Sequence, residues 1–324
     1  MAFDRGDVPD RVGPDGDGPT LTRRHLLLAG AGTLALAACG GGTTDEDTTE
    51  ADAVTTTSEG EPVDAEAPEE TGAEGGLILA RVFLAQQPVG HEIRLPLALA
   101  DAEGALLSDP PRSISVRVGP ADGELGEAVT IERHDRGIPR PYFPLRTTLT
   151  ATGAWRIVAD AEGTLAETVV NAMPPGELPA VPRPGDPLVA IETPTRSNPR
   201  GVDPICTADP PCPLHAESLR DVIGGDRSIV LLVSTPAFCQ TAICGPVLDL
   251  VVSRHEAYAD RVAMIHAEVF TDTTATTYTD VVRAYGLPFE PVLFLARPDG
   301  TVVDRLDYTF DSTELEQSLR ALTS

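Results

Sequence analysis

The sequence predicts two folded domains in series, a β-sandwich followed by an α/β domain with a mixed sheet. Between residues 77 and 173, short stretches of alternating apolar and polar residues recur about every ten positions and are separated by Gly, Pro and Asp, a pattern typical of strands and turns. Between residues 188 and 324, β-branched apolar runs alternate with stretches of helical periodicity. A proline-rich stretch, residues 174–187, separates the two patterns, and we expect it to be a semi-rigid, extended linker.

The first region, residues 77–173, contains no convincing helix, and its short strands predict a sandwich of the immunoglobulin type. Trp155, the only tryptophan, lies in the most clearly alternating strand and is expected in the core. We expect His91 and His134 to be separate and exposed. Half of a metal site is the less favoured alternative, because such a site needs at least three convergent ligands. We interpret this domain as a spacer or a binding platform. The expected strands are Leu77–Leu84, Glu92–Leu99, Ser113–Val118, Ala128–Arg133, Leu145–Thr150, Ala154–Ala159 and Glu167–Asn171.

The second region, residues 188–324, is organised around an apolar run, Ile229–Val233, which predicts a strand buried on both faces. Apolar residues recur at helical spacing from Val247 onward, and Pro298-Asp299-Gly300 supplies a hairpin turn. The expected elements are strand Leu188–Glu192, helix Ala216–Ile223, strand Ser228–Ser234, helix Gly245–Tyr258, strand Val262–Val269, helix Thr277–Tyr285, strand Val292–Ala296, strand Thr301–Leu306 and helix Ser312–Leu322.

Two cysteines, Cys239 and Cys244, fall where the central strand gives way to the following helix. A thiol near a helix N-terminus meets unpaired backbone N–H groups and the positive end of the helix dipole, which stabilise the thiolate. The pair is therefore a redox candidate. Five steps along a regular helix separate two α-carbons by about 8–9 Å, whereas a disulfide needs less than about 7 Å. If the pair is bridged, Cys239 must lie in a turn before the helix.

The element order, the cysteine pair and the stretch Gly286–Phe294 together resemble the thioredoxin fold, over roughly Leu188 to Ser324. The resemblance implies that Pro291 occupies the position of the proline, cis in that family, that faces the dithiol. It also implies a thiol–disulfide oxidoreductase in which Cys239 attacks a substrate sulfur and Cys244 resolves the mixed disulfide. The leading loop is more similar to extracytoplasmic, membrane-tethered redoxins than to cytosolic thioredoxin.

The chain departs from the thioredoxin pattern at three places near the dithiol. The family's cysteines are spaced Cys-x-x-Cys, whereas four residues separate them here. Phe238 stands where the family has Trp, and Val233 stands at the place of the family's buried acid. Glu290, directly before Pro291, is the nearest substitute for that acid. We expect Phe238, Glu290 and Pro291 to shape the substrate groove.

The N-terminal segment resembles an export signal with a lipidation site. Arg23 and Arg24 precede an apolar stretch, as in Tat signals, although Leu28 stands where Lys is frequent, so ordinary secretory export remains an alternative. Leu36-Ala37-Ala38-Cys39 resembles the lipobox of bacterial lipoproteins, which implies cleavage after residue 38 and a lipid on Cys39. A short membrane anchor is the other interpretation, but the apolar run is shorter than the roughly 20 residues of a spanning helix. Residues 39–76 are acidic and are expected to form a disordered tether.

With Cys39 lipidated, Cys206, Cys212, Cys239 and Cys244 remain, enough for two disulfides or for one disulfide and one dithiol. We favour pairing of sequence neighbours. If strands Leu188–Glu192 and Ser228–Ser234 run parallel in a β-α-β unit, the loops that leave them emerge at one sheet edge. Cys206 and Cys212 are then a staple over the dithiol or a partner dithiol that exchanges electrons with it.

The formal net charge of -26 argues against nucleic acid or anionic membrane as a partner through charge. The leading hypothesis is a lipid-anchored, extracytoplasmic oxidoreductase whose partners are protein thiols and disulfides. The alternative is a cell-surface binding module whose cysteines are structural. Sco-type copper handling, for which His215 and His266 are the nearby histidines, is less favoured, because His266 is interpreted as a packed sheet residue. Peroxide reduction is also less favoured, because Thr235 lies four residues before Cys239 rather than three. No cofactor or metal is assigned.

Overall fold

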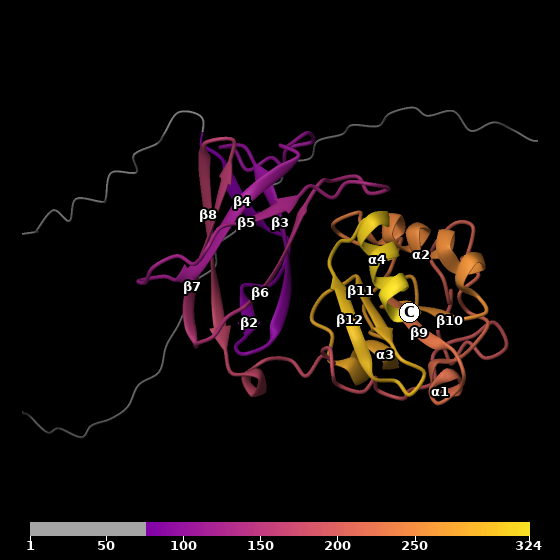
Figure 1. Cartoon of the computed structure of the whole chain (residues 1–324). Coiled ribbons are helices and arrows are strands. Elements are labelled where there is room, and N and C mark those ends of the chain that lie inside the picture. The colour runs from indigo at the N-terminus through magenta and orange to yellow at the C-terminus, as the bar shows by residue number, and fades with distance from the viewer. Residues whose placement is uncertain (1–75) are drawn as a thin grey trace, which may run out of the picture. The chain divides into compact units, whose positions relative to one another are not determined.

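The computed structural model describes residues 76–324 of the chain (Figure 1). The expected signal peptide, Cys39 and all but the last residue of the acidic tether lie outside the described residues. No helix among residues 76–324 is long and apolar enough to cross a membrane.

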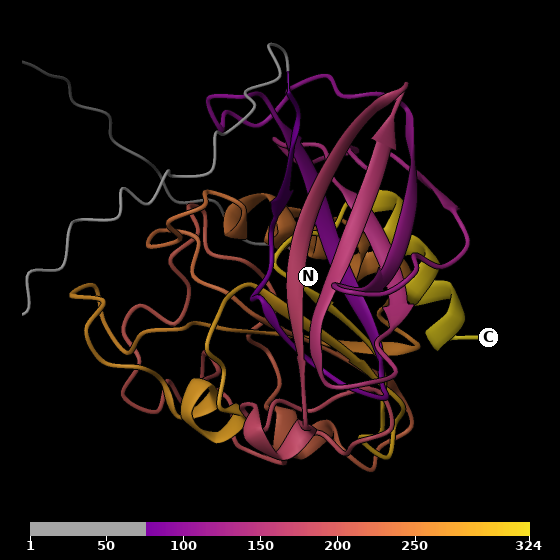
Figure 2. The same cartoon turned by 90° about the vertical axis from the view of Figure 1, so that its left-hand side faces the viewer.

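Eight strands of the first region form two sheets (Figures 1 and 2). The three-stranded sheet has the order β1-β3-β6 and the five-stranded sheet the order β2-β8-β7-β4-β5, and all neighbours are antiparallel except β2 and β8. Each of the seven expected strands overlaps one of these. Strand β2 was not expected, because its three residues are too short to show alternation. The bounds are β1 (Ile78–Arg81), β2 (Gln86–Pro88), β3 (Glu92–Ala100), β4 (Ser113–Pro120), β5 (Val129–Glu132), β6 (Phe143–Thr148), β7 (Gly153–Ala161) and β8 (Thr164–Met173).

Apolar side chains from both sheets meet in one core, which makes the first region a β-sandwich. Leu95 and Leu97 of β3 and Ile157 of β7 are fully buried there. Trp155 is buried as expected, and its indole N–H donates to the carbonyl oxygen of Ala151 at 2.9 Å. Alternation along β7 places its apolar side chains between the sheets, whereas β3 is buried over most of its length.

The second region contains a four-stranded sheet of order β10-β9-β11-β12. Strand β9 (Ser228–Val233) is central and runs parallel to β10 (Val262–Ala267), whereas β11 (Val292–Ala296) is antiparallel to both β9 and β12 (Val302–Asp307). Side chains of β9 are buried on both faces, as the apolar run predicts. The order of strands and helices along the chain makes this an α/β arrangement with a mixed sheet.

Helices cover both faces of this sheet. Apolar residues of α2 (Cys244–Tyr258) and α4 (Ser312–Leu322) pack in one core with one face of the strands. Those of α1 (Leu219–Val222) and α3 (Asp280–Tyr285) pack in a second core with the other face. Alternate residues of β9 belong to alternate cores, so the sheet holds the two layers of helices apart.

The expected strand Leu188–Glu192 is wrong, because these residues form no strand. Other segments already bond both outer strands of the sheet. The end of the proline-rich stretch runs along β12, where Gly185 donates to the Val302 carbonyl and Val302 donates to the Asp186 carbonyl, each at 2.9 Å. On the other side of the sheet, the loop of residues 203–215 bonds the end of β10, where His266 donates to the Leu214 carbonyl, and the segment that follows it. The proline-rich stretch is thus fastened to β12 rather than suspended between the domains.

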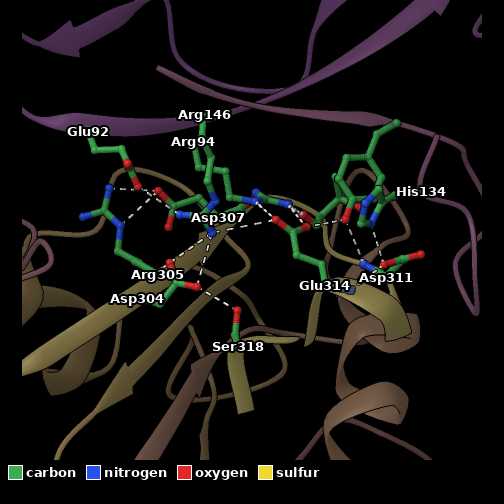
Figure 3. A network of polar contacts seen from close by, with 12 residues as sticks. Glu92, Arg94, His134, Arg146, Asp304, Arg305, Asp307, Asp311, Glu314 and Ser318 are labelled. Atoms are coloured by element: carbon green, nitrogen blue, oxygen red, sulfur yellow. Dashed lines mark hydrogen bonds and ion pairs between the residues drawn. The ribbon is translucent and has the colours of Figure 1, made fainter. Parts of the chain in front are cut away.

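Buried charges join the sandwich to helix α4, as Figure 3 shows. Arg94 of β3 forms a two-pronged ion pair with Glu314 of α4, with both nitrogen–oxygen distances at 2.6 Å, and the two side chains are only 4% and 6% exposed. The Arg94 guanidinium also donates to the carbonyl oxygens of Asp307 and Thr309. Burial acts to raise the pKa of Glu314, but Arg94, Tyr142 and His134 together more than offset it, so the pKa lies below its ordinary value.

Asp311, the residue that precedes α4, also contacts side chains of the sandwich (Figure 3). Its side chain caps the helix by accepting from the Glu314 backbone N–H, and it pairs with His134 at 2.8 Å. The Tyr142 hydroxyl contacts Glu314 and accepts from the Asp311 backbone N–H at 3.0 Å. The expectation that His134 is exposed is therefore wrong, because its carboxylate partner lies far along the sequence. His91 is exposed as expected.

Candidate functional site

Cys239 and Cys244 occupy the turn and first helical position after strand β9. Cys239 accepts a backbone hydrogen bond from Ala242 at 3.2 Å through its carbonyl oxygen, and Ala242 has a positive φ of 55°. Helix α2 begins at Cys244, one residue earlier than expected. Cys239 thus lies in a turn before the helix, which is the condition that the spacing imposed on a bridged pair. The two sulfur atoms and a carboxylate oxygen of Glu290 all lie within 4.8 Å of one another.

The surroundings favour the thiolate of Cys239 over that of Cys244. The pKa of Cys239 is lowered to about 5, chiefly by a hydrogen bond with Cys244. Thr241 and backbone N–H groups also lower it, whereas burial acts to raise it. The Thr241 hydroxyl oxygen lies 3.4 Å from the Cys239 sulfur. The same sulfur–sulfur hydrogen bond, burial and the Glu290 charge raise the pKa of Cys244. Cys239 is half-buried and Cys244 fully buried, so the accessible sulfur is the ionised one.

Glu290 faces the buried thiol from the residue before Pro291, and the peptide bond between them is cis. Its Oε2 atom accepts from the Thr235 backbone N–H at 2.8 Å and lies 3.6 Å from the Cys244 sulfur. Burial and the nearby Cys239 thiolate raise the pKa of Glu290 to about 7. A carboxyl group with this pKa exchanges protons near neutral pH, and its only sulfur donor among the described residues is Cys244. The sequence-based choice of Glu290 as the acid near the dithiol therefore agrees with its position.

Aromatic side chains lie beside the turn that carries Cys239. Phe238 is half-buried and packs edge-to-face against Phe270, with ring centroids 6.1 Å apart. Phe270 in turn stacks on Tyr278, whose side chain is exposed. Pro291 is buried and accepts from the Tyr308 backbone N–H through its carbonyl oxygen. Of the three expected groove residues, Phe238 and Glu290 are thus partly accessible.

A second cluster, which the sequence analysis missed, brings together Cys206, Cys212, His215 and His266. Each offers one ligand atom, and these atoms lie within 4.8 Å of one another. All four side chains are buried, with exposed fractions between 0% and 6%. His266 is a buried strand residue as expected, but its ring faces the two sulfur atoms. The four cysteines of residues 76–324 are free thiols. The spacing Cys-x5-Cys-x2-His within one loop was the available signal.

The loop that carries this cluster is held along the outer edge of β10. His266 donates its backbone N–H to the Leu214 carbonyl at 3.1 Å, and Asp203 donates to the Thr271 carbonyl at 2.9 Å. Thr207, next to Cys206, accepts from the Ala237 backbone N–H at 3.1 Å and so contacts the turn that carries Cys239. The loops that carry the two cysteine pairs thus contact each other, although the strand on which that expectation rested is absent.

A cavity beside the sandwich contains neither cysteine pair. It has a volume of about 340 Å³ and lies between the sandwich, the proline-rich stretch and β12. Its walls include Phe83, Arg94, Phe289 and Tyr308. The Phe289 and Tyr308 rings stack there with centroids 4.3 Å apart. Phe289 thus lines the cavity, and the next residue, Glu290, contacts the dithiol.

No protein-family model and no curated protein matches the chain. Several solved structures match part of it. The Lin-41 filamin domain is 16% identical over 31% of this chain and 92% of its own, with a TM-score of 0.22. A superoxide reductase (neelaredoxin) from Ignicoccus hospitalis is 9% identical over 30% and 79%, with a TM-score of 0.20. The Escherichia coli adhesin FdeC is 19% identical over 38% and 36%, with a TM-score of 0.20. Similarities at this level carry no argument about function.

Proposed function

We propose that the chain is a thiol–disulfide oxidoreductase that acts through Cys239 and Cys244, in a thioredoxin-like second domain. The observation that carries the proposal is the asymmetric pair itself: an accessible sulfur with a lowered pKa, a buried sulfur with a raised pKa, and a carboxylate within reach of the buried one. The strand order β10-β9-β11-β12, with helices on both faces and the dithiol after the central strand, supports a thioredoxin-like fold.

In the first step the Cys239 thiolate attacks one sulfur of a substrate disulfide. A sulfur–sulfur bond forms between Cys239 and the substrate, the substrate disulfide breaks, and the second substrate sulfur leaves as a thiolate. The hydrogen bonds that lower the pKa of Cys239 keep it ionised near neutral pH, so that no base has to act on it. The partly exposed position of Cys239 gives the substrate access.

In the second step Cys244 resolves the mixed disulfide. Its proton passes to the Glu290 carboxylate, 3.6 Å away, and the resulting thiolate attacks the Cys239 sulfur. A disulfide forms between Cys239 and Cys244, and the substrate sulfur leaves as a thiolate. Formation of the mixed disulfide removes the negative charge of Cys239, which is one of the causes that raise the pKa of Glu290. The chemistry thus converts the dithiol to a disulfide while the substrate is reduced, and it runs in reverse when the chain acts as an oxidant.

The substrates are protein thiols and disulfides outside the cytoplasm. Phe238 and Glu290, which are partly accessible, line the groove in which an extended substrate segment lies. The β-sandwich, of immunoglobulin type in this proposal, is a platform that presents the redox domain, and a lipid on Cys39 tethers both to the membrane. None of these assignments requires a cofactor.

A redox titration with alkylation and peptide mapping tests the proposal. In the purified full-length chain, the peptides that carry Cys239 and Cys244 should be linked by a disulfide that is reduced well above about -300 mV, because structural disulfides lie below that value. Cys239→Ser should abolish disulfide reduction, and Cys244→Ser should trap a mixed disulfide with the substrate. The oxidoreductase proposal fails if no disulfide links these peptides, or if the disulfide has a reduction potential below about -300 mV.

A binding module is the second candidate, and the cavity of about 340 Å³ beside the sandwich favours it. Apolar and charged side chains converge there, which is the usual composition of a ligand pocket. In this case the cavity, not the dithiol, is the functional site. An unaltered affinity for a surface partner in the Cys239→Ser variant, together with loss of affinity on Tyr308→Ala, would support this candidate over the redox one.

A further inference from the structure

We propose that Cys206, Cys212, His215 and His266 form a closed, four-coordinate metal site that takes Zn²⁺. The site uses a different cysteine pair from the dithiol, and the proposal does not depend on thiol–disulfide exchange at Cys239. It rests on the separations between the four ligand atoms, on the hydrogen bonds that orient the two rings, and on the burial of the whole cluster.

The separations between ligand atoms match those of a tetrahedral zinc centre. Zinc binds sulfur at about 2.3 Å and imidazole nitrogen at about 2.0–2.1 Å, so tetrahedral angles place nitrogen and sulfur about 3.6 Å apart and two nitrogens about 3.3 Å apart. The His266 Nδ1 atom lies 3.6 Å from the Cys212 sulfur and 3.9 Å from the Cys206 sulfur. It lies 3.3 Å from the His215 Nε2 atom. Each of these distances is within about 0.3 Å of the tetrahedral value.

The hydrogen bonds of the rings leave the ligand nitrogens available. The His266 Nε2 atom lies 3.1 Å from both the hydroxyl and the carbonyl oxygen of Ser234, and in this proposal it carries the proton and donates to the carbonyl, which only accepts. Its Nδ1 atom therefore presents a lone pair to the sulfur atoms. Such a second contact to a backbone carbonyl is how metal-binding histidines are commonly oriented. Among the described residues, the His215 Nδ1 atom has no hydrogen-bond partner, so the polar contacts of that ring lie on its Nε2 side.

The convergence of four buried ligand atoms makes a cation at this point favourable. The four side chains are almost fully removed from water, and sulfur atoms with imidazole lone pairs converge on one point. Polar groups gathered in this way are costly to bury without a partner. Two thiolates and two neutral imidazoles around Zn²⁺ give a site with no net charge. A disulfide between Cys206 and Cys212 would use both sulfur atoms but would leave the two imidazole nitrogens facing one another.

The donor set also selects among metals. Tetrahedral sites of two sulfur and two nitrogen ligands are typical of zinc, whereas magnesium and calcium prefer oxygen ligands. With all four positions taken by protein side chains, the site has no open position for substrate and is of the structural kind. It would fasten the loop of residues 203–215 to the edge of β10, beside the turn that carries Cys239. Thr207, which bonds both Glu268 and Ala237, sits at the joint between the loop and that turn.

Metal binding to the full-length chain provides the test. The reduced, chelator-treated chain should take up one Zn²⁺, and Co²⁺ in its place should give the visible bands of a tetrahedral ion together with a thiolate-to-metal charge-transfer band. Cys206→Ser should weaken Zn²⁺ binding by more than about 100-fold, since even loss of an outer-shell partner costs 10- to 100-fold. Cys239→Ser is the matched control and should retain the ion while losing thiol exchange.

A second measurement on the unaltered chain covers the case in which Cys206→Ser does not fold. Bound Zn²⁺ should slow alkylation of the peptides that carry Cys206 and Cys212, and leave alkylation of Cys239 unchanged. The proposal is overturned if the reduced chain takes up no Zn²⁺, if Cys206→Ser folds and binds Zn²⁺ as tightly as the original, or if Zn²⁺ protects only Cys239 and Cys244.

Discussion

The hydrogen bond between Cys244 and Cys239 should set the acidity of the accessible thiol, and replacing Cys244 tests this. Cys244 is the largest single cause of the lowered pKa of Cys239, and Cys244→Ala removes that cause. Cys244→Ser is the matched control, since a hydroxyl still donates a hydrogen bond from the same position. The Ala variant should have a Cys239 pKa well above that of the Ser variant. Thr241 and the backbone N–H groups remain, so the pKa should stay below its ordinary value.

The size of the effect can be worked out for alkylation rates. With a pKa of about 5 rather than the ordinary 9.0, Cys239 is about 900-fold more ionised than an ordinary thiol at pH 6. Its thiolate is also roughly 40- to 100-fold less nucleophilic, because nucleophilicity falls with pKa at a slope of 0.4–0.5. Cys239 should therefore react roughly 10- to 20-fold faster than an ordinary thiol at pH 6. At pH 8 the ionised fractions differ only about 11-fold, so it should react several-fold more slowly.

The assay is the rate of iodoacetamide alkylation between pH 4 and pH 9, with the Cys239 peptide quantified by mass spectrometry. In the original chain the rate should be nearly constant above about pH 6 and should fall as the pH drops through about 5. In Cys244→Ala the fall should begin at a higher pH. An unaltered profile in Cys244→Ala, or a rate in the original chain that still rises steeply between pH 7 and pH 9, would refute the reasoning.

Two further predictions concern buried carboxylates. Burial raises the pKa of Glu290 to about 7, so the folded chain keeps a proton that the unfolded chain releases above about 4.5. The unfolding free energy of the original chain should therefore decrease relative to that of Glu290→Gln as the pH rises from about 4.5 to 7. Denaturant titrations should show a decrease of at most about 3 kcal/mol. Glu290→Gln should also accumulate mixed disulfide in quenched turnover samples, and rapid resolution in that variant would contradict the proton transfer. Arg94→Met should cost about 3–5 kcal/mol of unfolding free energy because it leaves Glu314 buried without its partner. The double variant with Glu314→Gln should cost less than the sum of the two single variants, and strict additivity would show that the ion pair contributes no coupling.

Local sequence patterns were sufficient where an element is defined by its own residues. Strand β11 and helix α4 begin and end at the residues expected, because an uninterrupted apolar run and a capped amphipathic helix mark their own limits. The stretch Leu188–Glu192 has strand-like composition, but whether it pairs depends on a free sheet edge. Residues 185–187 bond the outer edge of β12 and the loop 203–215 bonds the end of β10, and that outcome depends on contacts distant in the sequence.

The candidate site divides in the same way. Cys239 and Glu290 could be chosen from the sequence because each adjoins a recognisable element, β9 or Pro291. The link between Cys206 and His266 could not, since a strand histidine looks like any other core residue until the loop opposite it is placed. His134 was misjudged for a related reason, because its partner Asp311 lies 177 positions away. Long-range partners of polar residues are the information that residue patterns do not carry.

The ion pair between Arg94 and Glu314 has a consequence for how the two halves of the chain can be inherited. The sandwich provides the counter-charge for a helix whose backbone belongs to the other half, together with contacts to the cap at Asp311. A gene fragment that encodes only residues 188–324 would lack Arg94, the counter-charge of Glu314, and the contacts to the cap at Asp311. The halves therefore should not shuffle freely into other proteins as independent modules. Exchange of either one would require compensating changes at Arg94 or Glu314.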